Sequence, residues 1–244
     1  LITQKPLKAL IFFSLPMIIG NLFQQAYTMA DSAIVGRLVG ENALAAVGAA
    51  YSLTNIFICI AIGGGIGASV IVSQYFGQGN YGKLKKAIYT ALLSFLVIST
   101  LLGGFGLVFS KNIMRALNTP AEVLDMAVTY LKIYFLGLPF LFMYNVLSSM
   151  FNALGKSRIP LYFLIFSSVF NIILDWIFVA DFHLDVAGVA WATLIAQGVS
   201  VVGSFTVLLK VLGKLEGNAD GIFAPEELLP MTRIALPSIL QQST

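Results

Sequence analysis

The chain alternates between long apolar runs and short connections that carry most of its charged residues. A helix that crosses a bilayer needs roughly 20 predominantly apolar residues, and every run reaches that length. Several runs are longer, which implies helices that tilt or extend beyond the hydrocarbon. The pattern predicts six membrane-spanning helices, near residues 9–35, 44–74, 87–109, 122–153, 160–180 and 187–212.

Polar residues recur at helical spacing inside four of these runs. In the first run they follow steps of three and four residues, so that one helix face carries them all. Such a face is unsuited to lipid, and we expect the four stripes to point inward. Hydrogen bonds between helices, worth on the order of 0.6 to 2 kcal/mol each, account for most of the Ser and Thr residues but poorly for the carboxylates. The stripes are Met17, Gly20, Gln24, Tyr27 and Asp31; Tyr130, Tyr134, Gly137, Asn145, Ser148 and Asn152; Ser168, Asn171 and Asp175; and Thr193, Gln197, Ser200 and Ser204.

The composition supports lipid as the solvent of this chain. Of its 244 residues 58% are apolar and 10% are charged, whereas a globular chain is about 45 to 50% apolar and about 25% charged. We therefore predict an all-α, polytopic membrane protein, with a bundle of six transmembrane helices followed by the start of a seventh. The single cysteine, Cys59, allows no intrachain disulfide and no cysteine-based metal site.

Basic residues are unevenly divided between alternate connections. Topology therefore explains the net charge of +3 better than binding to nucleic acid does. The positive-inside rule predicts a multi-pass protein of the inner (plasma) membrane with a cytoplasmic amino terminus. One side carries Lys5, Lys8, Lys83, Lys85, Lys86, Lys156, Arg158, Lys210 and Lys214, and the other carries Arg37, Lys111 and Arg115.

A weak internal repeat divides the chain. Residues 234–239 echo residues 13–18, each with a Leu-Pro pair after a basic residue and a short apolar lead-in. An even number of predicted spans separates the two copies, so they enter the membrane in the same direction, as in transporters built from parallel repeats. We expect a six-helix lobe over 1–212, a cytoplasmic linker over 213–227 and the truncated start of a second lobe over 228–244. The missing initial Met and the stop inside the seventh apolar segment suggest a fragment.

Asp31 and Asp175 are the candidates for ion chemistry. A charge in mid-membrane costs at least about 2.5 to 3.5 kcal/mol, and such residues usually mark ion pathways or proton relays. At about 1.5 Å per residue, both acids, Tyr130 and Thr193 fall at a similar depth in the outer half. Asn171 lies one turn from Asp175. Oxygen donors of these kinds suit an alkali cation, and a carboxylate pair in a low dielectric can instead hold a proton. The alternative is that the acids are merely interfacial.

Four segments together carry a family resemblance. They are Leu15-Pro16 with 21–25, the run 29–36 (MADSAIVG), the Gly-rich second span ending in 74–77 (QYFG), and 171–175 with its Asn-x-x-x-Asp spacing. The chain resembles the amino-terminal lobe of the multidrug and toxic compound extrusion (MATE) family along essentially its whole length. The acid in the first helix and the Asn-x-x-x-Asp motif are similar to the prokaryotic, DinF-like branch. Members have twelve helices in two six-helix lobes and export organic cations or other amphiphiles in exchange for protons or sodium.

The resemblance implies a role for particular residues. It implies a cation site, for H⁺ or Na⁺, at Asp31, Asn171, Asp175 and Thr193, with Tyr130 and Asn145 nearby. It also implies that Pro16 is a kink at which the first helix bends when Asp31 is protonated. The implied substrate cavity is lined by Gln24, Tyr27, Met17 and Gln197.

The resulting prediction is a secondary active multidrug exporter that works by alternating access and requires its own carboxy-terminal lobe. No cofactor beyond the coupling ion is expected, and the partners are small-molecule drugs and membrane lipid rather than nucleic acid. A lipid-linked saccharide flippase of the same superfamily is the alternative, but it would need more basic side chains than Lys132 within the spans. A membrane enzyme would need a nucleophile, base or metal set that the spans lack, and a purely structural role predicts no ion-dependent thermal shift.

Overall fold

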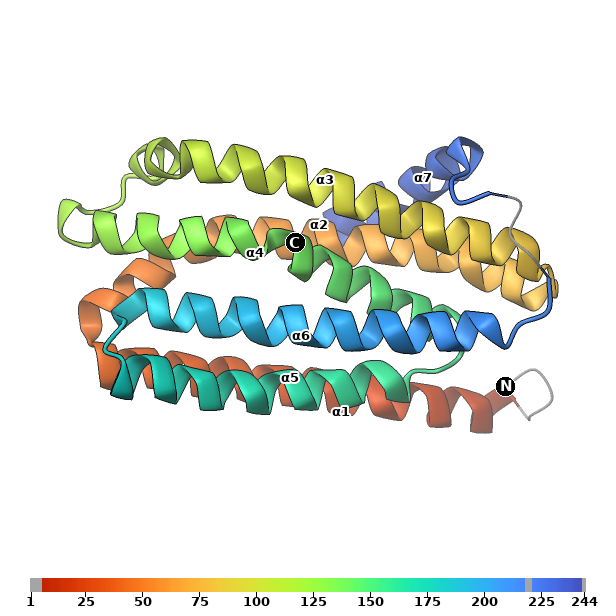
Figure 1. The fold of residues 1–244 in the computed structure, drawn as a ribbon, viewed down its shortest axis with the longest axis horizontal. Helices are drawn as coiled ribbons and strands as arrows, with labels where there is room; N and C mark the ends of the chain where they lie inside the picture. The colour runs from red at the N-terminus through yellow and green to blue at the C-terminus, as the bar shows by residue number, and fades with distance from the viewer. Residues whose placement is uncertain (1–5, 218–220, 243–244) are drawn as a thin grey trace.

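Helices make up nearly all of the described chain (Figure 1). The computed structural model describes residues 6–217 and 221–242. Lys5 and the last two residues of the predicted second-lobe segment lie outside the described residues. The elements are α1 (Pro6–Ile34), the π-helical turn η1 (Val35–Val39), α2 (Glu41–Gly77), α3 (Tyr81–Ala116), α4 (Ala121–Ala153), α5 (Arg158–Trp176), the π-helical turn η2 (Ile177–Asp181), α6 (Asp185–Gly213) and α7 (Pro225–Gln242).

The predicted all-α membrane fold is confirmed. Within the described residues, α2, α3, α4, α6 and the continuous stretch of α5 with η2 are long and apolar enough to cross a membrane. α1 has 29 residues and is therefore also longer than the roughly 20 residues that a span needs. Some helices are longer than the apolar runs that predicted them. α3 has 36 residues, which is a length of about 54 Å at 1.5 Å per residue, whereas the hydrocarbon core of a bilayer is about 30 Å thick.

Successive helices run back and forth between two ends of the bundle (Figure 1). α1 begins at the end where α6 stops and α7 starts, and we call this the linker end. Asp31 and Asp175 lie near the opposite end, which we call the far end. Short turns join α2 to α3, α3 to α4 and α4 to α5, and the two helices of each of these pairs are in contact.

Three helices end in the same hydrogen-bonded turn. After α4, Gly155 takes a φ of 70°, its N–H donates to Asn152 O, and Lys156 N–H donates to Phe151 O. This is the Schellman arrangement, in which the residue after the helix must be left-handed and glycine enters at least cost. The equivalent positions after α2 and α3 are Gly79 and Asn118, with φ of 69° and 55°.

α4 forms the centre of the bundle, packed against α2, α3 and α6. Near the middle of α4, Phe135 is fully buried and meets the ring of Phe57 edge to face, with centroids 5.4 Å apart. Toward the linker end, Met150 and Phe151 join a second cluster with residues of α2, α3 and α6. These two apolar clusters hold α4 in place, so the backbone that carries Tyr130 and its polar neighbours has a fixed position.

Candidate cation-coupling site

α1 and α5 lie side by side and bring the two predicted acids together. The contact is close near the linker end, because a Cβ on Gly20 would touch side chains of Leu161 and Leu164 at 3.6 to 3.7 Å. Both helices run toward the far end (Figure 1), so residues separated by the same interval stay level. Asp31 is level with Asp175, and their carboxyl groups lie close enough to interact.

The acid pair is enclosed by protein. Asp175 is 0% exposed, and Asp31 is half-buried. One oxygen of each carboxyl, Oδ1, is shielded from solvent and has no hydrogen-bond partner among the described residues. Two ionised carboxylates in this contact would repel each other in a low dielectric, so the geometry fits a pair that shares one proton.

Asn171 is the hub that joins three helices at the pair. Its amide satisfies every neighbour when the nitrogen faces α1 and the oxygen faces α6. The nitrogen then donates to Asp175 Oδ2 at 2.9 Å and to Tyr27 Oη at 3.0 Å. The oxygen accepts from Thr193 N–H at 3.0 Å and from Thr193 Oγ1 at 3.2 Å. The predicted association of Asp31, Asn171, Asp175 and Thr193 thus has direct contacts in the structure.

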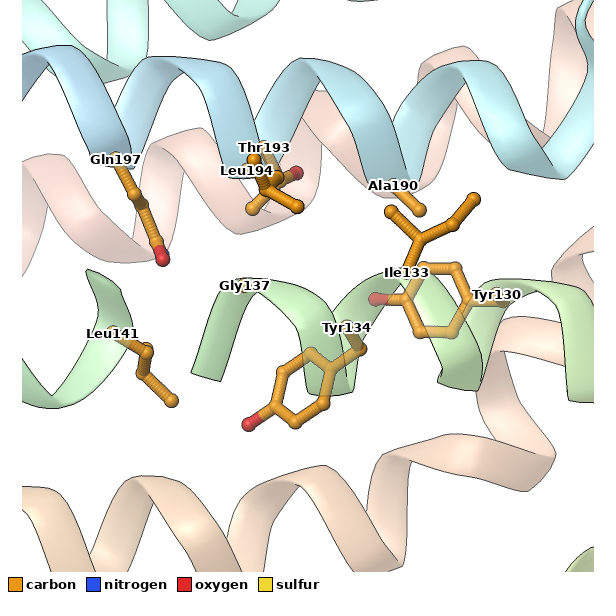
Figure 2. Close-up of a pocket in the computed structure, with 9 residues that line it drawn as sticks. All are labelled: Tyr130, Ile133, Tyr134, Gly137, Leu141, Ala190, Thr193, Leu194 and Gln197. Carbon is orange, nitrogen blue, oxygen red and sulfur yellow. The ribbon is translucent and has the colours of Figure 1, made fainter. Parts of the chain in front are cut away.

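Tyr130 comes from α4 and closes the cluster on a fourth side, near both acids. Figure 2 shows it beside a small cavity between α4 and α6, opposite Ala190 and Thr193. The cavity holds about 30 Å³, which is room for one or two water molecules. Tyr134 lies on the same face and donates its hydroxyl to Thr54 O of α2 at 3.1 Å.

A π-helical turn follows each acid. η1 begins four residues after Asp31, and η2 begins two residues after Asp175. The two turns contact each other, and their buried valines, Val35 and Val179, share one apolar cluster. Such turns are frequently found at functional sites because the wider helix alters where nearby side chains point. Here they cap the acid pair on the far side.

The remaining predicted residues lie apart from the acid pair. Asn145 is about 22 Å further along α4 than Tyr130 at 1.5 Å per residue, and its amide donates to Leu141 O. Gln197 lines the small cavity within the lobe (Figure 2). Gln24 is exposed, and Met17 is 42% exposed. Pro16 is buried within an unbroken α1.

The orientation of the Asn171 amide decides which of its atoms faces the acid pair. No group of three or more His, Cys, Asp and Glu side chains gathers in the described part of the chain. In the orientation above, the oxygen of Asn171 faces Thr193 and its nitrogen faces Asp175. A sodium ion between Asp31 and Asp175 would need the amide to turn, because a cation binds oxygen and not the N–H group.

Sequence reasoning missed one member of the cluster. The resemblance places Tyr27 in the substrate cavity, and in the structure its hydroxyl accepts from Asn171 at 3.0 Å. The signal was present, because Tyr27 lies one helical turn before Asp31 and therefore on the same face of α1. The identity of the residue opposite it on α5 could not be read without knowing the register of the two helices.

The comparisons with known proteins agree with this architecture. The MatE family matches residues 16–177. The chain is 32% identical over 203 residues to the probable multidrug resistance protein YpnP of Bacillus subtilis, which covers 83% of this chain and 46% of that protein. It is 29% identical over 234 residues to the multidrug export protein MepA of Staphylococcus aureus, covering 96% and 52%.

Solved structures resemble the fold over nearly the whole chain. One is described as the outward-facing conformation of a multidrug resistance MATE family transporter of the MOP superfamily. It has a TM-score of 0.90 and 26% identity, and the match covers 98% of this chain and 53% of that one. A MATE structure in the straight conformation has a TM-score of 0.90 at 26% identity, covering 98% and 54%. This chain spans about half the length of these relatives, and it belongs to the MATE family, whose members are membrane transporters and not enzymes.

Proposed function

We propose that the chain is the first lobe of a secondary active multidrug exporter that exchanges organic cations or amphiphilic drugs for protons by alternating access. The observation that carries the proposal is the enclosed contact between Asp31 and Asp175. A pair of carboxyl groups that shares one proton can release it when the pair is separated or when a cationic substrate approaches. The names of the relatives, which are multidrug resistance and export proteins, supply the substrate class.

Proton exchange with the drug follows from charge and from position. Asp31 lies on α1, and Gln24, two turns earlier on the same helix, is exposed at the surface of the lobe. A cation that binds along this surface in the complete protein would favour the ionised pair and so expel the proton. Entry of a proton from the other side would favour release of the cation, which is the reciprocity that linked binding requires.

The orientation of the lobe is part of the proposal. Lys83, Lys85, Lys86, Lys156 and Arg158 lie at the linker end, whereas Arg37, Lys111 and Arg115 lie at the far end. By the positive-inside rule the linker end faces the cytoplasm, and the acid pair is nearer the outside of the plasma membrane. The second lobe would complete the substrate cavity, so transport needs the full-length protein.

Thermal stability of the purified full-length protein tests the site and the ion together. We expect the melting temperature to change with pH at constant salt, and not to change when Na⁺ replaces K⁺ at constant pH. Asp31→Asn and Asp175→Asn should each remove most of the pH response. A stabilisation by Na⁺ over K⁺ that both variants abolish would assign sodium to this site instead. A pH response in both variants as large as that of the parent protein would place the coupling proton elsewhere.

A further inference from the structure

The small cavity between α4 and α6 has polar groups on both of its walls (Figure 2). Its α4 wall includes Tyr130, Gly137 and Leu141, and its α6 wall includes Thr193 and Gln197. On each helix these residues are one or two turns apart, so they share one helix face. The volume of about 30 Å³ is room for one or two water molecules.

Two polar groups point into this cavity from opposite walls. In Figure 2 the hydroxyl of Tyr130 points along α4 toward Gly137, and the side chain of Gln197 extends from α6 toward α4. Among the described residues, neither the Tyr130 hydroxyl nor the Gln197 amide has a hydrogen-bond partner. An enclosed polar group without a partner costs free energy, and a cavity of this size holds water that has two or more polar neighbours. The two groups therefore form the polar ends of a water site.

The packing around the cavity fixes its size. Gly137 contributes no side chain, and a Cβ there would already lie 3.3 Å from Leu194 Cγ. Leu141 and Ala190, which also line the cavity, are buried. A drug-sized ligand needs a pocket of about 300 to 1,000 Å³, which is at least about tenfold larger than this one. Gln197, which the family resemblance places in the substrate cavity, therefore faces a space that fits water and not a drug.

Tyr130 connects the cavity to the acid pair. Its hydroxyl faces the cavity, and its side chain lies near both Asp31 and Asp175. On the opposite wall, Thr193 Oγ1 donates to the oxygen of Asn171 at 3.2 Å, and the nitrogen of the same amide donates to Asp175. Water held in the cavity is thus one tyrosine away from the carboxyl groups.

We propose that Gln197 positions water in this cavity against the Tyr130 hydroxyl, and that protons leave and reach the acid pair through this water. The proposal rests on the function proposed above, because it supplies a path for the proton that the exporter exchanges. The side chain of Gln197 is half-buried, so it stands between the enclosed water and the accessible surface of the lobe. Its amide donates and accepts hydrogen bonds but does not ionise. Gln197 is therefore a positioning residue and not a proton carrier.

Each transfer leaves Tyr130 and the water as they began. When the acid pair loses its proton, one carboxyl donates it to the Tyr130 oxygen while the hydroxyl donates its own proton to the neighbouring water. That water passes a proton to the next water, beside Gln197. One O–H bond forms for each that breaks, so the net change is one carboxyl that becomes a carboxylate and one proton that leaves on water. The reverse sequence reloads the pair.

Gln197→Met tests the role of the amide in the full-length protein, because methionine has a similar length and only a weak hydrogen-bond acceptor. Ethidium efflux from proteoliposomes is driven by a pH difference, and its initial rate is measured against ethidium concentration. We expect the maximal rate to fall about tenfold, the equivalent of one net hydrogen bond, with the KM for ethidium unchanged. The final ethidium gradient should equal that of the parent, because the acid pair still sets the stoichiometry. Gln197→Asn, which keeps the amide, should recover most of the rate.

A solvent isotope effect separates this role from a folding defect. Loss of folded protein lowers the rate equally in light and heavy water, whereas a slow proton transfer raises the ratio of the two rates. We expect a larger ratio for Gln197→Met than for the parent. Gln78→Met is the matched control, because Gln78 is exposed in the turn between α2 and α3. Its rate and its isotope ratio should be those of the parent.

An unchanged maximal rate in Gln197→Met, or a lower rate with an unchanged isotope ratio, would overturn the proposal. A raised KM at an unchanged maximal rate would also overturn it, since Gln197 would then contact the drug. If the parent itself builds no ethidium gradient, the proposed function fails, and a high-resolution map of the full-length protein decides the water site. Such a map should show water within about 2.7 to 3.2 Å of the Gln197 amide and the Tyr130 hydroxyl, and a map without it would overturn the site.

Discussion

The substitution Asp175→Asn tests the role of the shared proton while it leaves most of the hydrogen-bond cluster intact. Asp175 is fully buried, and its Oδ2 accepts from Asn171 at 2.9 Å. An asparagine has nearly the same shape, keeps an oxygen for Asn171 and offers an N–H group to Asp31. The fold should therefore survive while the pair loses the ability to exchange a proton.

The expected size of the effect follows from the stoichiometry. One acid pair shares one proton, and a pH difference of one unit is worth about 1.4 kcal/mol per proton, which is a factor of about ten in concentration. Exchange of one proton for one singly charged cation moves no net charge, so the membrane potential adds nothing. The parent protein should build a gradient of up to about tenfold in ethidium under these conditions, and Asp175→Asn should build none.

The assay uses full-length protein in proteoliposomes with an imposed pH difference of about one unit, read by ethidium fluorescence and collapsed by nigericin. Asp125→Asn is the control, because Asp125 is an exposed carboxylate on α4. It should behave as the parent does. Equal ethidium gradients in Asp175→Asn and the parent, both abolished by nigericin, would refute the role of the pair.

Three further predictions follow from single contacts. Asn171→Leu removes all of the amide's hydrogen bonds to Tyr27, Asp175 and Thr193 and leaves these groups unsatisfied, at a cost of about 1 to 3 kcal/mol each. The melting temperature should fall by several degrees, and an unchanged melting temperature would contradict the role of Asn171 in joining the three helices. Gly103→Ala would place a Cβ 2.7 Å from Phe135 O and should destabilise the protein by about 1 to 3 kcal/mol. Gly104→Ala, where the added Cβ meets open space, should stabilise it by about 0.5 to 1 kcal/mol. If denaturation shows that both variants change the free energy of unfolding in the same direction, the close α3–α4 contact is refuted. A hydrogen bond from its own backbone N–H and, second, the hydrogen bond from Lys86 hold the pKa of Glu226 below its usual 4.5. The stability that the ionised carboxylate contributes is therefore present above pH 4.5 and is lost as the pH falls through the lowered pKa. Glu226→Gln should reduce the loss of stability on acidification, as measured by the melting temperature at neutral and at acid pH.

The hydrophobic pattern predicted the long apolar helices well. The spans near 44–74 and 122–153 correspond to α2 and α4 within a few residues, while the span near 87–109 is the middle of a longer α3. The extra turns of α3 carry Lys83, Lys85 and Lys86 at one end and Lys111 and Arg115 at the other. Hydropathy reports where lipid could be, but a helix continues past that limit while its backbone hydrogen bonds can be made, so the true ends were not readable.

The candidate site was predicted in part. The spacing of Asn171 and Asp175 on one helix and the cost of buried charge identified the acids, and the depth estimate brought Tyr130 and Thr193 to the same level. The estimate could not distinguish neighbours on different helices. The contact between Tyr27 and Asn171 was therefore not predicted, and the pairing of Asp31 with Asp175 was inferred only as convergence at one depth.

What the sequence by itself determined was the medium, the helices and the faces that carry polar groups, because each depends on residue chemistry and on a period of 3.6 residues along one helix. Only the tertiary structure decided which faces meet. It brought Asp31 level with Asp175, turned the Asn171 amide between α1 and α6, and laid the glycines of α2 against the backbone of α7. The physical reason is that the relative register and rotation of packed helices result from many side-chain contacts at once, and no local pattern in the sequence encodes their sum.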